Sequence, residues 1–214
     1  MKYKKGKNFE ILDRKSVFID SSVVIGDNVT IYENNRIMGK TVIEDNVIIF
    51  PGCFINDTLI GKGSKINASQ TDNAIIGENC EVGPFARLRP KAVIKDSAKI
   101  GNFVEIKNAT VGKGSKVSHL AYVGDADVGE NCNIGCGAIF VNYNGRTKNR
   151  TTVGDECFIG SNCNIIAPVK IESKSYICAG TTITEDVDTD DFVIGRVRQE
   201  VKQNRAHKYL KEYK

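Results

Sequence analysis

His119 and two nearby cations are the residues of this chain whose types and spacing best support chemistry. A neutral imidazole accepts a proton near pH 7, so His119 is a candidate general base. Arg89 and Lys107 lie eighteen residues apart, and each follows a large apolar residue. Two stacked cations repel each other unless an anion lies between them, and phosphate suits the planar fork of arginine and the compact charge of lysine. Together with Tyr122, these residues predict a site that holds a phosphorylated molecule beside a base.

A six-residue repeat sets the elements that would position these side chains. Every sixth residue is isoleucine over the unbroken series Ile19, Ile25, Ile31, Ile37, Ile43, Ile49 and Ile55. Six residues match neither the period of an α-helix nor that of a β-strand. The repeat is typical of a β-helix, in which each hexapeptide forms a short strand and a corner, and three faces close a coil of about eighteen residues. The sequence therefore predicts an all-β solenoid.

A second position of the repeat holds small residues. Five of the seven cysteines occupy this position, four residues after the large apolar one: Cys53, Cys80, Cys132, Cys157 and Cys163. Large and small side chains together would fill a narrow prism. We interpret these cysteines as buried, reduced thiols rather than metal ligands or disulfide partners. Reduced thiols, the lack of a signal peptide and the lack of an apolar run of about eighteen residues predict a cytoplasmic protein with no membrane partner.

Three segments are expected along the chain. The repeat runs from Ile19 to Ile183, a span of 165 residues that corresponds to about nine coils. We expect a leader or linker over residues 1–16, the β-helix over residues 17–184, and a C-terminal tail over residues 185–214 that starts acidic and continues basic, with room for a helix. Residues 141–152 break the repeat and should leave the prism as a loop, where function often resides.

The net charge is +4 with its basic excess at both ends, which favours solvated tails over nucleic-acid binding.

Counting coils assigns the candidate residues to faces. Val117, Ile134, Ile159 and Ile177 fall on one face, so two positions later an outward column forms from His119, Cys136, Ser161 and Ala179, with about 4.8 Å between coils. Arg89 and Lys107 belong to the neighbouring face, and Tyr122 lies at the corner between the two. A groove lined by small side chains suits a long, thin acyl carrier. His119 would take a proton from an amine or hydroxyl that attacks a thioester, while a backbone N–H near Cys136 stabilises the oxyanion.

Several longer strings in the sequence resemble a known family. They are Gly83 to Pro90 (GPFARLRP), Gly101 to Gly129 (GNFVEIKNATVGKGSKVSHLAYVGDADVG), Asn142 to Gly145 (NYNG), Ile166 to Val169 (IAPV) and Ala179 to Thr184 (AGTTIT). Together they resemble the acetyltransferase domain of the bifunctional enzymes that make UDP-N-acetylglucosamine. The resemblance implies a left-handed parallel β-helix and a homotrimer with sites at subunit boundaries. It also implies acetyl transfer from acetyl-CoA to the amine of glucosamine 1-phosphate, giving N-acetylglucosamine 1-phosphate for UDP-N-acetylglucosamine and cell-wall peptidoglycan precursors.

The resemblance also assigns roles to individual residues. It makes His119 the general base, and it gives Arg89, Lys107, Tyr122 and Asn133 as ligands of the sugar phosphate. Lys148, on the predicted loop, is expected to reach the site of a neighbouring subunit. The implied contacts of acetyl-CoA are Cys136, Asn142, Tyr143, Ser161, Ala179 and Arg196. No metal is needed for this reaction.

Two features depart from the family. Position 136 is Cys where the family usually has a smaller residue, which would narrow the thioester pocket or, if the contact is through the backbone N–H, change little. No Gly-rich nucleotide-binding loop precedes the coils, so we expect no uridyl transfer and either an excised domain or a free-standing acetyltransferase.

Alternatives to this function stay open at the level of the sequence. The acceptor could be another amino-sugar phosphate, or the chain could be a non-catalytic trimeric β-helix that serves as a scaffold. A metal-dependent hydratase would need a cluster of histidines, and the chain has only His119 and His207.

Overall fold

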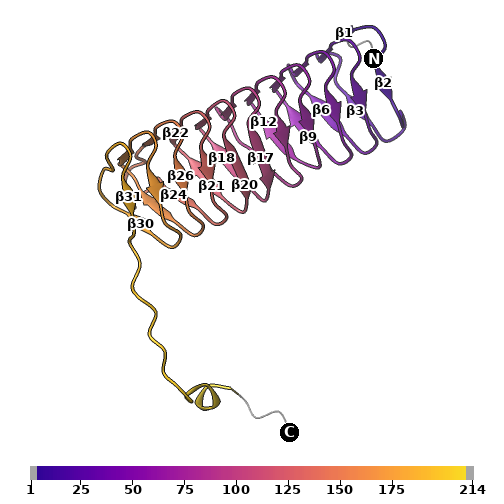
Figure 1. Cartoon of the computed structure of the whole chain (residues 1–214). Helices are drawn as coiled ribbons and strands as arrows, with labels where there is room; N and C mark the ends of the chain where they lie inside the picture. Colours follow the sequence, from indigo (N-terminus) through magenta and orange to yellow (C-terminus); the bar gives the residue numbers. More distant parts are fainter. Residues whose placement is uncertain (1–3, 211–214) are drawn as a thin grey trace.

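The six-residue repeat forms three sheets that run along one rod (Figure 1). The computed structural model describes residues 4–210. Each coil contributes one short strand to each face, and neighbouring coils pair in parallel. The predicted all-β fold, a left-handed parallel β-helix, is confirmed.

The strands can be named by face, in stacking order. Face A contains β1 (Lys4–Lys5), β4 (Val24–Ile25), β7 (Val42–Ile43), β10 (Leu59–Ile60), β13 (Ile75–Ile76), β16 (Val93–Ile94), β19 (Thr110–Val111), β22 (Ala126–Val128), β25 (Thr151–Val153) and β28 (Lys170–Ile171). Face B contains β2 (Glu10–Ile11), β5 (Thr30–Ile31), β8 (Ile48–Ile49), β11 (Lys65–Ile66), β14 (Glu81–Val82), β17 (Lys99–Asn102), β20 (Lys116–His119), β23 (Asn133–Ile134), β26 (Phe158–Ile159), β29 (Tyr176–Ile177) and β31 (Phe192–Val193). Face C contains β3 (Phe18–Ile19), β6 (Arg36–Met38), β9 (Phe54–Asn56), β12 (Gln70–Asp72), β15 (Arg87–Leu88), β18 (Glu105–Lys107), β21 (Tyr122–Gly124), β24 (Ile139–Val141), β27 (Asn164–Ile166) and β30 (Thr182–Ile183).

The core is a stack of inward side chains, and most strands contribute one large apolar residue to it. Ile31, Ile37 and Ile55 are fully buried, and the ladder continues through the rod in the same way. The residue before each large one points outward, because side chains alternate along a strand. A short strand thus carries one core side chain and one side chain for the surface, which makes each outward face a regular grid.

The cysteines behave as small apolar residues. All seven are free thiols, and the five at the small position of the repeat are buried, as predicted. Burial raises the pKa of the Cys53 thiol to about 11, so this thiol stays protonated and unreactive at neutral pH. Cys136, which lies outside that position, is exposed.

The coils extend beyond the expected range of 17–184. β1 and β2 lie within the expected leader of residues 1–16 and pair with β4 and β5, and β31 adds a strand beyond β29 in the expected tail. The stack therefore has ten or eleven strands per face instead of about nine coils. The first coil escaped notice because Lys5 stands where later coils have isoleucine, so the apolar period begins only at Ile19. Residues 1–3 of the expected leader and 211–214 of the expected tail lie outside the described residues.

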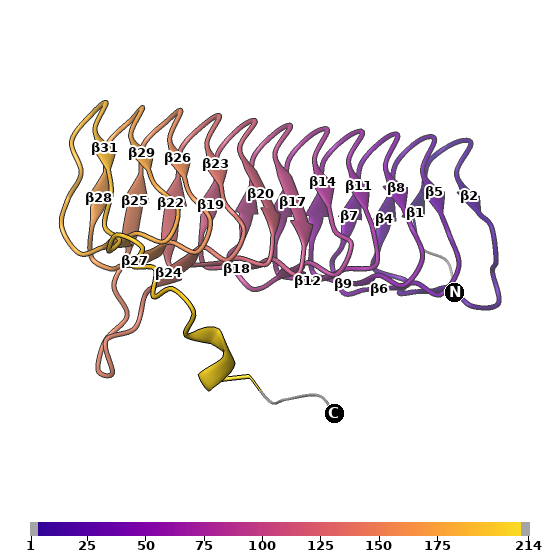
Figure 2. The ribbon, with the colours of Figure 1, turned by 60° about the horizontal axis from the view of Figure 1, so that its bottom comes forward.

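Two segments leave the rod. The chain between β24 and β25 projects as a loop, at the place where the repeat breaks (Figure 2). Beyond β31 the tail runs away from the coils, and its helical part is one short turn, η1 (Ala206–Lys208). Within residues 4–210 no helix has the length and apolar character needed to cross a membrane.

Candidate functional site

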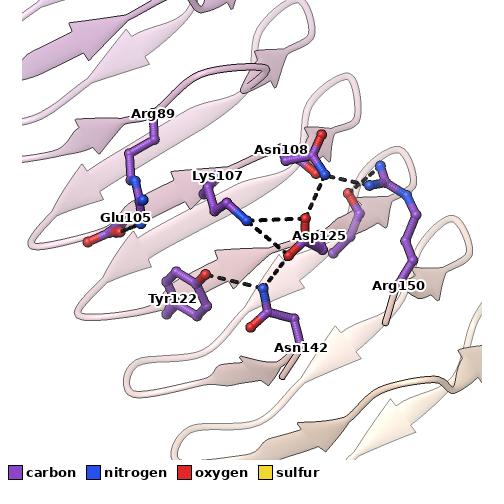
Figure 3. A network of polar contacts seen from close by, with 9 residues as sticks. Arg89, Glu105, Lys107, Asn108, Tyr122, Asp125, Asn142 and Arg150 are labelled. Carbon is purple, nitrogen blue, oxygen red and sulfur yellow. Dashed lines mark hydrogen bonds and ion pairs between the residues drawn. The ribbon is translucent and has the colours of Figure 1, made fainter. Parts of the chain in front are cut away.

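A polar cluster lies on face C beside the projecting loop (Figure 3). Arg89 follows β15, Lys107 ends β18 and Tyr122 begins β21. The strand register pairs Leu88 with Ile106, so the next residues, Arg89 and Lys107, stack on adjacent coils. This is the stacking that their eighteen-residue spacing predicts. Tyr122 lies on the same face, one coil further along.

Each stacked cation already has a carboxylate partner. Arg89 Nη1 lies 2.8 Å from Glu105 Oε1, and both side chains are about one-third exposed. Lys107 Nζ lies 3.2 Å from Asp125 Oδ2 in a more enclosed position. The expectation that only a bound anion would separate the two cations was therefore incomplete. Each cation has further N–H donors that a ligand could use, because a guanidinium has five donors and an ammonium three.

A third cation, Lys148, reaches the cluster from the loop. The side chain of Lys107 lowers the pKa of Lys148, and the charge of Arg89 lowers it further. Like charges gathered at one point are typical of a site for an anion. Within this chain Lys148 therefore faces its own Lys107, and its reach into a neighbouring subunit stays a prediction.

His119 ends β20 on face B, next to the corner that leads to face C. It is exposed, and its Nδ1 lies 2.7 Å from Oδ1 of Asn102, its partner in the strand register. An amide oxygen can only accept a hydrogen bond, so in this arrangement Nδ1 carries the proton and donates it to Asn102. Nε2 is then the unprotonated nitrogen, which a general base requires.

The predicted column on face B is present as counted. β20, β23, β26 and β29 are consecutive neighbours in the sheet, and the column residues follow them: His119, Cys136, Ser161 and Ala179. Backbone bonds of 2.8 Å from Asn162 N to Cys136 O and from Gly180 N to Ser161 O hold the coils in line. Arg196 of the tail donates from Nη1 to Ala179 O at 3.0 Å. All four column residues are exposed, so the column forms an open track.

The other predicted site residues lie in different places. Asn133 begins β23 on face B, paired with Lys116, so one chain does not bring it to the cations of face C. Asn142 is buried beneath the cluster, where its amide contacts Tyr122 Oη at 3.3 Å. Tyr143 is exposed on the loop and donates from Oη to Gly145 O at 2.8 Å.

A cavity of about 470 Å³ opens beside Arg89 on the side of the earlier coils. Met38, Asn56, Asp72 and Arg87 line it together with Arg89. Within residues 4–210 no group of three or more His, Cys, Asp or Glu side chains is arranged to hold a metal ion.

The chain matches known proteins along most of its length. Residues 70–142 match the family described as GMPPB C-terminal domain, and residues 150–185 match the hexapeptide repeat of succinyl-transferase. The bifunctional protein GlmU of Clostridioides difficile (strain 630) is 47% identical over 198 residues, covering 92% of this chain and 43% of that protein. GlmU of Clostridium novyi (strain NT) is 46% identical over 189 residues, covering 88% and 41%. The chain is a homologue of part of the GlmU proteins.

The chain spans about two fifths of the length of the GlmU proteins it matches, with 42% of GlmU from Geobacillus sp. (strain WCH70) as a further example. These relatives confirm the family resemblance drawn from the sequence motifs.

Sequence analysis missed four polar residues of this GlmU homologue. They are Asn102, Glu105, Asn108 and Asp125. Asn102 could have been found by stepping one coil back from His119, and Glu105 by the same step from Tyr122. Asn108 and Asp125 lie at corners, where the repeat shortens by one residue and gives no signal for the direction of a side chain.

Proposed function

We propose that this chain transfers the acetyl group of acetyl-CoA to the amine of glucosamine 1-phosphate, with N-acetylglucosamine 1-phosphate and CoA as products. The observation that supports the proposal is the position of His119 at the end of β20, in the column of small residues on face B and one corner before face C, which carries Arg89 and Lys107. The chain is also 47% identical to GlmU over 92% of its length. The acetyl-CoA track and the sugar-phosphate cluster then occupy neighbouring faces of the rod.

The residues of the site divide the reaction between them. Arg89 and Lys107 bind the phosphate, with Lys148 as a third cation, and this leaves the amine of the sugar near His119. His119 Nε2 takes a proton from the amine as the nitrogen attacks the thioester carbon. The new C–N bond forms, the C–S bond breaks, and the proton passes to the departing thiolate. A backbone N–H beside Cys136 stabilises the charge on the carbonyl oxygen.

The acetyl-CoA arm would follow the column through Cys136, Ser161 and Ala179. Asn142, Tyr143 and Arg196 would contact it from the loop and the tail. Asn133 lies away from the cations within one chain, which fits a site completed by a second copy, so we include the homotrimer in the proposal. We also include a cytoplasmic location, which fits free thiols, and a reaction that needs no metal.

Release of free CoA tests the proposal. Purified protein is mixed with acetyl-CoA and glucosamine 1-phosphate, and the thiol released is followed with time. We expect turnover that depends on both substrates, and no release above background from folded protein would reject the proposal. Other amino-sugar phosphates in the same assay identify the preferred acceptor.

His119→Ala separates an enzyme from a scaffold. We expect turnover to fall by about 10²- to 10⁴-fold, with the oligomeric state and the melting temperature unchanged. A non-catalytic β-helix would lose nothing measurable. His207→Ala, in the short turn of the tail, is the matched control and should leave turnover as it is.

A further inference from the structure

Asp125 is the one charged residue among residues 4–210 that is buried, with 7% of it exposed. It forms the corner between β21 and β22 (Figure 3). Its backbone N–H donates to Lys107 O at 2.9 Å, and its carbonyl accepts from Thr151 N at 3.1 Å. The coil therefore fixes the backbone of Asp125 without help from its side chain.

The corner itself does not require a buried carboxylate. Asp57, Asn73 and Lys91 make equivalent corners in earlier coils, with the same left-handed backbone, at φ of 44°, 45° and 65° against 48° for Asp125. Their side chains are exposed. Burying a charge is costly unless the charge is paired and hydrogen-bonded. Since the corner conformation does not explain why Asp125 is buried, the reason must lie in the contacts of its side chain.

The Asp125 carboxylate accepts hydrogen bonds from three side chains. Lys107 Nζ lies 3.2 Å from Oδ2 and 3.4 Å from Oδ1, and Asn108 Nδ2 lies 2.5 Å from Oδ1. Asn142 Nδ2 donates to Oδ2 and also lies 3.3 Å from Tyr122 Oη. Burial acts to raise the pKa of Asp125, but the bonds from Asn108, Lys107 and Asn142 outweigh it and lower the pKa. The group is thus a carboxylate, which only accepts hydrogen bonds.

An acceptor at this point fixes the orientation of both neighbours. The amide of Asn142 must turn its Nδ2 inward, so its Oδ1 faces away from Asp125. The ammonium of Lys107 donates to the carboxylate, and this contact fixes the position of its Nζ. In the proposed function, Lys107 binds the sugar phosphate and Asn142 binds acetyl-CoA. One buried carboxylate therefore touches a side chain from each half of the site.

We propose that Asp125 is a positioning residue that holds the side chains of Lys107 and Asn142 in fixed positions relative to each other. The sugar phosphate bound by Lys107 and the acetyl-CoA bound by Asn142 are then also fixed relative to each other. This proposal rests on the proposed function for the identity of the two ligands. Because Asp125 is buried, we do not expect it to touch either substrate.

Asp125→Asn tests the proposal, because Asn keeps the size of the side chain and tolerates the left-handed backbone. An amide cannot accept from all three donors, so Lys107 and Asn142 lose their shared partner. We expect the affinities for glucosamine 1-phosphate and for CoA each to fall about tenfold or more, measured by calorimetry, and both KM values to rise. Asp57→Asn, the same change at an equivalent corner, should leave both affinities unchanged.

The affinity of the Asp125→Asn variant for inorganic phosphate distinguishes a positioning role from a purely electrostatic one. If Asp125 were only a nearby negative charge, its removal would strengthen binding of inorganic phosphate by reducing repulsion. If it served the fold alone, the melting temperature would fall while the affinities of the folded protein stayed the same. Either result overturns the proposal.

Asn142→Ala is the second variant, and it keeps the test open if Asp125→Asn fails to fold. We expect it to weaken binding of glucosamine 1-phosphate as well as CoA, although Asn142 is assigned only to acetyl-CoA. Loss confined to CoA contradicts the proposal.

The failure of the proposed function can be told apart from the failure of this inference. If the unaltered chain binds CoA and inorganic phosphate but releases no CoA in the assay, the function fails and the affinities of the variants still decide the role of Asp125. If it binds neither ligand, both fail.

Discussion

The orientation of the His119 ring depends on one hydrogen bond. Nδ1 lies 2.7 Å from Asn102 Oδ1, and this contact leaves Nε2 free to accept a proton. We expect Asn102→Ala to lower kcat about tenfold, because the ring would sample other orientations and the other tautomer. The KM for each substrate should change little, since Asn102 is not expected to bind either one.

Steady-state kinetics across pH measures this effect. Asn102→Asp restores an acceptor for Nδ1–H and should recover most of kcat, while Asn164→Ala, on an exposed strand position of face C, should have no effect. A kcat for Asn102→Ala equal to that of the unaltered chain would mean that His119 is oriented by other contacts.

A second residue-level prediction concerns the ion pair at the base of the loop. Arg150 Nε lies 2.5 Å from Asp127 Oδ2, and Arg150 also donates to the carbonyls of Asn108 at 2.9 Å and Ala126 at 3.1 Å. The bond from Arg150 lowers the pKa of Asp127. A lowered carboxyl pKa gives stability that is complete above the ordinary value of about 3.9 and is lost as the pH falls through the lower folded value.

Arg150→Gln should therefore destabilise the chain at pH 7 by no more than about 1 kcal/mol, because both side chains are more than one-third exposed. The difference from the unaltered chain should shrink at acid pH, below the ordinary carboxyl value, as Asp127 takes up protons. Urea unfolding at pH 7 and at an acid pH measures this difference. An equal difference at both would assign the effect to the carbonyl contacts of Arg150.

The sequence could predict side chains on strands better than side chains at corners. The column of His119, Cys136, Ser161 and Ala179 was found by counting, because the apolar period fixes which strand residues stack. Asp125 was missed because it lies within a step, from Val123 to Val128, that is one residue short of the repeat. At a corner the chain no longer alternates inward and outward, so spacing does not give the direction of a side chain.

At the scale of the strands and corners, glycines permit adjacent coils to approach each other closely. A Cβ on Gly112 would lie 2.2 Å from Gly129 O and 2.4 Å from Gly129 C, both backbone atoms of the next coil. We expect Gly112→Ala to destabilise the chain by about 1–3 kcal/mol, because the coils would have to move apart. Urea unfolding followed by circular dichroism measures the loss.

Gly52→Asn is the matched control for this prediction. A Cβ at Gly52 would meet nothing nearer than 3.9 Å, and its φ of 79° lies in the left-handed region that asparagine tolerates. Asn34 and Asn46 already adopt that region at other corners, with φ of 58° each. Gly52→Asn should therefore cost far less than Gly112→Ala, and equal losses would show that close approach between coils is not the cause.

The first strands of the β-helix show what the six-residue repeat alone could not predict. The repeat identified the fold and the projecting loop, since both follow from the presence or absence of an inward apolar residue. It missed β1 and β2, which pair with β4 and β5. β1 has Lys5 where later coils have isoleucine, and Ile11 of β2 packs against the core but lies eight residues before Ile19 instead of six.

At the scale of the whole molecule, the rod and its tail have separate roles. Each coil contacts mainly its neighbours, so the stability of the rod is a sum over adjacent coils. The tail beyond β31 adds little to that sum, since Val197, Val201 and Tyr209 are 94%, 70% and 85% exposed. Arg196 of the tail donates a hydrogen bond to Ala179 O in the column. The tail is therefore placed to affect the ligand more than the fold.

A chain truncated after Gly195 tests whether the tail affects ligand binding more than stability. We expect the melting temperature to change by no more than a few degrees, because the deleted residues bury little apolar surface. The affinity for CoA should fall about fivefold or more, since the charge-assisted contacts of Arg196 at the end of the column are lost. Arg196→Ala in the full chain should reproduce most of that loss, and Arg198→Ala should not. A truncated chain that binds CoA as tightly as the full one would assign the whole acetyl-CoA site to the coils and the loop.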